Sequence, residues 1–186
     1  MKEGSKMKMV SIAFGRHLLR LPLAAMLPLM MAAGLNCGLA QAETPVERGR
    51  YLVTMGGCND CHTPGYFFGK PDQNRILGGS DVGFVGSDHG TYVGPNLTPD
   101  AETGLGNWSP DDIVTAIQTG VTPEGRELAP MMPWRRFAGL KKSDAYAIAA
   151  YLKSLPAVSN KVAGPYGASE RVTIPVMRIV QPQSSN

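Results

Sequence analysis

Hydrophobic residues recur at helical spacing in three stretches of this chain, each bounded by start and stop signals. The first stretch begins at Thr44-Pro45, where a hydroxyl side chain precedes a proline at the first helical position, and it ends near Gly56-Gly57. The second begins in the same way at Ser109-Pro110 and ends at Gly120, a residue suited to the left-handed conformation that closes many helices. Both patterns predict amphipathic helices.

The third helical pattern is expected to use Ser143 as its N-cap and to end before Pro156. Residues 63–107 show no comparable periodicity, although a small β-hairpin around Phe84 and Tyr92-Val93 is compatible with them. The chain therefore predicts an all-α fold with three main helices, long loops and at most a small hairpin. A loop of this length is unusual in a compact domain, unless a cofactor replaces part of the core.

The N-terminal pattern is that of an export signal. Five Lys and Arg precede an apolar run at residues 21–35, and Ala40-Gln41-Ala42 matches an A-x-A cleavage site. The run is short for a membrane span, and the alternative is a leader that is retained as an anchor. We therefore expect a signal peptide at 1–42, cleavage after Ala42, a domain at 43–156, an extended tail at 157–186 and a periplasmic location.

The basic character of the whole chain belongs largely to this leader. Of the 18 Lys and Arg, five lie in residues 1–42, whereas only one of the 15 Asp and Glu lies there. The remainder is close to neutral and shows no basic stripe interleaved with aromatic residues, so no nucleic-acid partner is expected. A membrane contact is expected only if the leader is retained.

Cys58, Cys61 and His62 form a C-x-x-C-H motif, which is typical of covalent c-type haem attachment. Side chains three positions apart share one face of a helical turn, so both thiols can reach the two vinyl groups at one edge of a porphyrin. The histidine that follows is placed to bind the iron as an axial ligand. We therefore expect one haem c and no disulfide.

Two other uses of the paired cysteines are weaker alternatives. A thioredoxin-like redox site needs a βαβ context, which the sequence around Cys58 and Cys61 does not show. A structural zinc site needs four nitrogen or sulfur ligands, and no further cysteine follows Cys61. The motif therefore favours haem over a redox dithiol or zinc.

The sixth position of a haem iron needs a second ligand, and four methionines and one histidine outside the leader are candidates. They are Met55, Met131, Met132, Met177 and His89. Met131 and Met132 stand in a proline-rich loop between the second and third helical patterns, which can lie over the other haem face. A thioether ligand raises the reduction potential, which suits electron transfer. We favour Met132, with Met131 and His89 as alternatives, and expect Met55 and Met177 to be packing residues.

In their order along the chain, these features resemble the class I cytochromes c over residues 44–156. The motifs that carry the resemblance are C-x-x-C-H, Gly94-Pro95-Asn96-Leu97, Trp108 before a helix, the Met-Pro loop and a helix containing Tyr151-Leu152. Residues 96–109 and 128–134 are similar to the haem modules of cytochrome subunits that serve bacterial periplasmic alcohol and sugar-acid dehydrogenases. Those subunits often carry several haem modules, whereas this chain has one C-x-x-C-H motif.

The resemblance implies roles for further residues. In such modules the methionine directly before proline is the ligand, which here is Met132. Pro95 would offer its carbonyl to the Nδ1–H of His62. Leu97 would pack on the porphyrin, and Trp108 would donate its indole N–H to a haem propionate. The resemblance also places two residues where the first and last helices cross, Gly49 and Tyr151.

An iron with both axial positions filled by the protein has no site for substrate, so the sequence predicts a one-electron carrier with no catalytic residue. The expected partners are a periplasmic dehydrogenase as donor and a cytochrome or oxidase as acceptor. The alternatives are a fixed cytochrome subunit of a dehydrogenase complex and, less favoured, a haem enzyme such as a peroxidase or a sulfur-compound oxidase. Five basic residues flank the predicted ligand loop and are either a docking surface for an acidic partner or a merely solvated face. They are Arg126, Arg135, Arg136, Lys141 and Lys142.

Overall fold

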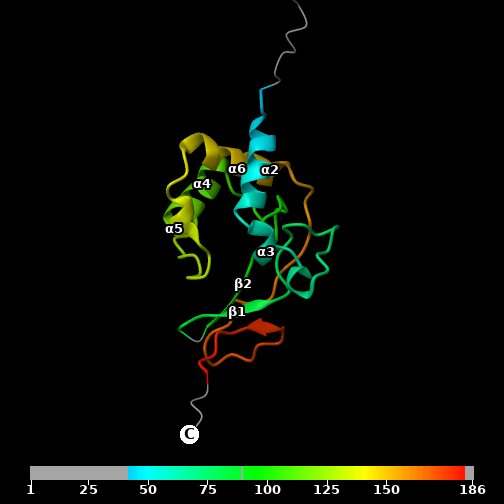
Figure 1. Ribbon diagram of the computed structural model, residues 1–186, viewed down its shortest axis with the longest axis vertical. Coiled ribbons are helices and arrows are strands. Elements are labelled where there is room, and N and C mark those ends of the chain that lie inside the picture. The colour runs from blue at the N-terminus through cyan, green and yellow to red at the C-terminus, as the bar shows by residue number, and fades with distance from the viewer. Residues whose placement is uncertain (1–41, 89, 183–186) are drawn as a thin grey trace, which may run out of the picture. The chain divides into compact units, whose positions relative to one another are not determined.

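The computed structural model describes residues 42–88 and 90–182 of the chain (Figure 1). Within these residues, five α-helices are α2 (Pro45–Met55), α3 (Cys58–His62), α4 (Pro110–Thr119), α5 (Trp134–Phe137) and α6 (Lys142–Ser154). The predicted leader and His89 lie outside the described residues. None of the helices that are described is long and apolar enough to cross a membrane.

The predicted starts of the first two helices are confirmed. Thr44 and Ser109 each accept a hydrogen bond from the backbone N–H three residues on, and an acidic side chain at that third position bonds back to the cap. Each is therefore a reciprocal capping box followed by proline. Gly120 ends α4 in the left-handed conformation, with φ of 77°.

The predicted start of the third helix is wrong by two residues, because the N-cap of α6 is Lys141 and not Ser143. The Lys141 carbonyl accepts hydrogen bonds from the N–H groups of Asp144 and Ala145, so the helix has already begun at Lys142. Lys141 makes no side-chain capping bond, and Asp144 in the first turn bonds Arg48 of α2 instead. Contact with another helix thus outweighs the local preference for a hydroxyl cap.

The core lies where α2 crosses α6, and Gly49 permits the approach. A Cβ placed on Gly49 would lie 1.9 Å from the carbonyl oxygen of Ala147 and 2.7 Å from Cβ of Tyr151, so only glycine fits. The crossing at Gly49 and Tyr151 agrees with the sequence prediction. Around it, the buried apolar residues are Val53, Leu77, Leu105, Ile113, Val114, Ala145, Ile148, Ala149 and Leu152.

The long loop contains a 3-10 turn, η2 (Tyr66–Phe68), and the predicted hairpin, formed by β1 (Gly83–Val85) and β2 (Thr91–Val93) with Phe84 opposite Tyr92. The expectation of at most a hairpin is incomplete, since β3 (Val176–Met177) adds a third strand parallel to β1. Figure 1 shows this red segment beside the green hairpin. The residues after α6 thus return to the body of the protein.

Candidate functional site

Helix α3 gathers the two thiols and the imidazole of the C-x-x-C-H motif on one short turn. Gly57 precedes it with φ of 67°, and the Asp60 N–H donates to the Gly57 carbonyl. The left-handed cap turns the chain sharply between α2 and α3, which a residue with a side chain would do only under strain. Cys58 and Cys61 are free thiols, each partly exposed.

Burial governs the protonation of the two thiols. It raises the pKa of Cys58 to about 11, and it also raises the pKa of Cys61. Both groups are therefore protonated at neutral pH in the chain alone. Among the residues described, no three or more His, Cys, Asp and Glu side chains lie together as a metal ion would need, so the structure adds no ligand for the zinc alternative.

His62 is buried, and its Nδ1 atom lies 2.8 Å from the carbonyl oxygen of Pro95. A carbonyl can only accept, so Nδ1 donates and the lone pair of the neutral ring lies on Nε2. Burial lowers the pKa of His62, which favours this neutral form. Nε2 makes no hydrogen bond with any described residue. An imidazole held in this tautomer beside two thiols fits a covalent haem.

Glycine makes the contact between His62 and Pro95 possible. A Cβ placed on Gly94 would lie 1.7 Å from the carbonyl oxygen of Cys61, so the segment before Pro95 can approach α3 this closely only without a side chain.

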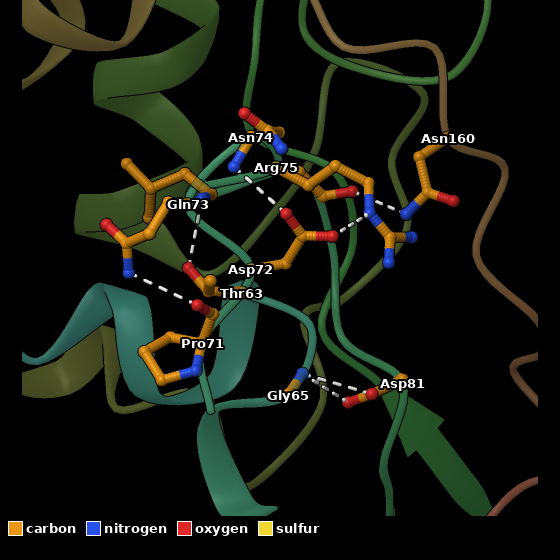
Figure 2. A network of polar contacts seen from close by, with 11 residues as sticks. Thr63, Gly65, Pro71, Asp72, Gln73, Asn74, Arg75, Asp81 and Asn160 are labelled. Carbon is orange, nitrogen blue, oxygen red and sulfur yellow. Dashed lines mark hydrogen bonds and ion pairs between the residues drawn. The ribbon is translucent and has the colours of Figure 1, made fainter. Parts of the chain in front are cut away.

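The turn that follows the C-x-x-C-H motif is stabilised by hydrogen bonds to an acidic side chain. The Gly65 N–H donates to both carboxylate oxygens of Asp81, at 3.1 and 3.0 Å, as Figure 2 shows.

The loop with the candidate methionine ligands leads into α5. Met131 and Met132 are half-buried, and the Met132 N–H donates to the Ala129 carbonyl. Helix α5 lies against the start of the haem motif, because a Cβ on Gly56 would lie 3.4 Å from the Phe137 ring and 3.6 Å from the Cys58 sulfur. The helix that follows the methionine loop therefore lies close to Cys58.

The other methionine candidates are exposed. Met55 ends α2 with 68% of its surface accessible, and Met177 lies in β3 with 46% accessible. Leu97 and Trp108 are partly buried and pack against the core. The indole N–H of Trp108 has no hydrogen-bond partner among the described residues, so it is available to an acceptor.

Lys153 was not identified from the sequence, although the structure connects it to Trp108. Its ammonium group donates to the carbonyls of Leu105, Gly106 and Trp108 at 3.1, 2.8 and 3.0 Å. The only sequence signal was a basic residue in the last turn of a predicted helix, where lysine often bonds carbonyls.

The five basic residues near the ligand loop are all exposed. Two of them already contact aromatic rings. The Arg135 guanidinium lies 4.5 Å from the ring centre of Trp134, and the Lys142 ammonium lies 5.6 Å from that of Tyr146. Arg135 of α5 and Lys142 of α6 therefore each lie over an aromatic ring of their own helix.

Comparison with known proteins identifies the family to which this chain belongs. The model for the family described as cytochrome c matches residues 46–156. The fructose dehydrogenase cytochrome subunit of Gluconobacter japonicus is 36% identical over 114 residues, which cover 60% of this chain and 22% of that protein. The cytochrome c subunit of the quinone alcohol dehydrogenase of Gluconobacter oxydans (strain 621H) is 34% identical over 131 residues, or 69% of this chain and 27% of that protein.

A third relative, a diheme c-type cytochrome of Cereibacter sphaeroides, is 31% identical over 110 residues, which cover 59% of this chain and 36% of that protein. The chain thus spans between about a fifth and a little over a third of the length of these three relatives. The family match covers more than half of the chain and includes both thiols, the buried imidazole and the carbonyl that orients it. This chain therefore belongs to the cytochrome c family, whose domain carries covalently bound haem c.

Proposed function

We propose that this protein is an exported one-electron carrier with a single haem c, attached through Cys58 and Cys61 and ligated by His62 and Met132. The observation that carries the proposal is the buried His62 ring, whose Nδ1–H is committed to Pro95 while Nε2 has no partner among the described residues. This is the state in which an imidazole binds iron. The number of haems and the identity of the sixth ligand are parts of this proposal.

The haem, when bound, supplies an iron that changes between the ferrous and ferric states. Five residues outside the two cysteines would then tune or hold it, namely His62, Pro95, Leu97, Trp108 and Met132. The Pro95 carbonyl fixes the His62 ring and raises its basicity, and Met132 would supply the second protein ligand to the iron. Leu97 excludes water from the porphyrin face, and Trp108 offers its N–H to a propionate. With both axial positions closed, the protein has no catalytic residue.

The proposed electron donor is a dehydrogenase, and the proposed acceptor is a cytochrome or an oxidase. This rests on two of the relatives, which are named as cytochrome subunits of fructose and alcohol dehydrogenases. The same observation favours a second candidate, a fixed cytochrome subunit of such a complex. Purification of the protein from its native membranes and periplasm separates them, because only a fixed subunit would copurify with a dehydrogenase in constant ratio.

The proposed location is the periplasm, with the leader cleaved after Ala42 and the haem domain spanning residues 43–156, followed by a tail at 157–186. The proposal rests on the charged, apolar and A-x-A regions of the leader. N-terminal sequencing of the exported protein tests it. A chain that begins at Glu43 supports cleavage, and an intact N-terminus in the membrane fraction supports the anchor instead.

An optical spectrum of the purified ferric protein tests the central proposal. We expect low-spin iron and the weak charge-transfer band at the red end of the visible spectrum that marks a methionine sulfur on ferric haem. The haem should also remain with the protein in acidified organic solvent, because it is held by thioether bonds. A high-spin ferric spectrum would show an open iron and overturn the carrier function.

A further inference from the structure

Residues 158–162 lie beyond the family match, which ends at residue 156, yet they contact the backbone that holds His62. We propose that residues 158–162, here called the strap, position the axial histidine and so tune the haem. The inference rests on the proposed role of His62 as an iron ligand. The strap residues act through two backbone segments and not by touching the ring.

The two backbone segments are residues 77–80 and 94–98, and His62 is bonded to both. The Gly79 N–H donates to the His62 carbonyl at 2.8 Å, and the ring donates to Pro95. The segments are also bonded to each other, since the Leu97 N–H donates to the Leu77 carbonyl at 2.8 Å. A shift of either segment therefore moves the groups that hold the imidazole.

The strap is bonded to the second segment through the residue that follows Pro95. Asn96 is 1% exposed and donates through Nδ2 to the Val158 carbonyl at 2.7 Å. Its Oδ1 accepts from both the N–H and the hydroxyl of Thr98, and the Val158 N–H donates back to that hydroxyl at 3.0 Å. Asn96 and Val158 thus form a closed buried network one residue away from the carbonyl that orients His62.

The strap is also bonded to the first segment. The Asn160 side chain donates to the Gly78 carbonyl at 2.7 Å, and Figure 2 shows this amide directed at the turn next to Arg75. Val162 lies against the next residue, since a Cβ placed on Gly79 would be 2.3 Å from its Cγ1. Gly79 has φ of 103° and donates to the His62 carbonyl, so Val162 packs against a residue that is bonded to the backbone of His62.

This arrangement gives the strap an electronic effect on the iron. The strength of the Nδ1–H to Pro95 hydrogen bond sets how strongly the imidazole donates electrons, because a second partner raises the basicity of a metal-bound histidine. If the strap is loosened, both segments gain freedom and that hydrogen bond weakens. The ferrous state then becomes relatively more stable, and the reduction potential rises.

The test is Asn160→Ala in the full-length haem protein, which removes the bond to Gly78 and leaves the backbone of the strap intact. We expect the Nδ1 proton of His62 and the Gly79 amide to exchange with deuterium about five- to tenfold faster, the factor that loss of one hydrogen bond produces in a local opening equilibrium. The reduction potential should shift upward. Gln118→Ala is the matched control, because it removes a partly buried amide bond to the Leu140 carbonyl away from His62.

The proposed role of the strap is refuted if Asn160→Ala leaves three quantities unchanged: the exchange rate of the His62 Nδ1 proton, that of the Gly79 amide, and the reduction potential. Equal changes in Asn160→Ala and Gln118→Ala would also refute it, because the effect would then be general loss of stability. If Asn160→Ala does not fold, Val162→Ala is measured in the same way. Failure of the proposed function looks different, because the unmodified protein itself would then lack a low-spin His-ligated spectrum.

Discussion

The Nδ1 atom of His62 and the carbonyl oxygen of Pro95 lie 2.8 Å apart, although 33 positions separate them in the chain. The contact selects one tautomer of a buried ring and leaves Nε2 as the only nitrogen that can bind a metal. It also explains why Gly94 precedes the proline, since a side chain there would collide with the Cys61 carbonyl. The orientation of the His62 ring therefore depends on the absence of a side chain at Gly94.

Replacement of Met132 distinguishes the two methionines of the ligand loop. Met132→Ala should abolish the methionine–ferric charge-transfer band and lower the reduction potential, because a thioether ligand stabilises ferrous iron. Met131→Ala is the matched control, since both side chains are half-buried in the same turn. Optical spectra and potentiometry of the two variants check the assignment, and loss of the band in Met131→Ala alone would reverse it.

Gly94→Ala should prevent correct ligation by His62. The added methyl group would lie 1.7 Å from the Cys61 carbonyl oxygen, so either α3 or the Pro95 segment must move. We expect a loss of about 2 kcal/mol or more in the free energy of unfolding. Gly139→Ala is the control, because a Cβ there meets no atom within 4 Å. Chemical denaturation of both variants measures the difference, and equal stabilities would contradict the close approach.

Lys153→Met should loosen the loop that ends at Trp108. The change retains much of the apolar stem but removes three hydrogen bonds from an ammonium group to the carbonyls of Leu105, Gly106 and Trp108. Loss of a charged donor from partly buried acceptors costs about 1 to 3 kcal/mol. Thermal unfolding and amide exchange of residues 105–108 report the effect. Lys70→Met serves as the control, because Lys70 is exposed and no side-chain hydrogen bond is described for it. An equal loss of stability in both variants would show that the three bonds of Lys153 do not stabilise the loop.

The sequence predicted correctly those features that form between residues close together in the chain. Thr44 and Ser109 were identified as helix caps because a hydroxyl, a proline and an acidic residue act within one turn. The start of α6 was misplaced because Asp144 bonds Arg48, which is 96 positions away. The third strand and the strap were missed for the same reason, since Val176 and Asn160 find their partners far along the chain.

Within the site, the C-x-x-C-H motif indicated the thiols and the imidazole because all three lie on one helical turn. The contact between His62 and Pro95 was expected only through resemblance, because spacing alone cannot bring together two residues on separate segments. Lys153 shows the same limit. Its basic charge is visible in the sequence, but the three carbonyls that it binds are defined only by the folded loop.

The ion pair between Arg48 and Asp144 should make stability depend on pH in the acid range. The two groups lie 2.9 Å apart, and the hydrogen bond from Arg48 lowers the pKa of Asp144 below its ordinary value of 3.8. Because the folded-state pKa is the lower one, the stabilisation is fully present above about pH 3.8 and is lost as the pH falls through the folded-state value.

Asp144→Asn keeps the acceptor oxygen and removes the charge. The difference in free energy of unfolding between the unmodified protein and Asp144→Asn should therefore be constant near neutral pH and shrink on acidification. Added salt should reduce it as well, since the pair is partly exposed. Denaturation curves at several pH values measure this difference in the free energy of unfolding. A difference that stays constant down to pH values well below 3.8 would show that the ion pair does not link the two helices electrostatically.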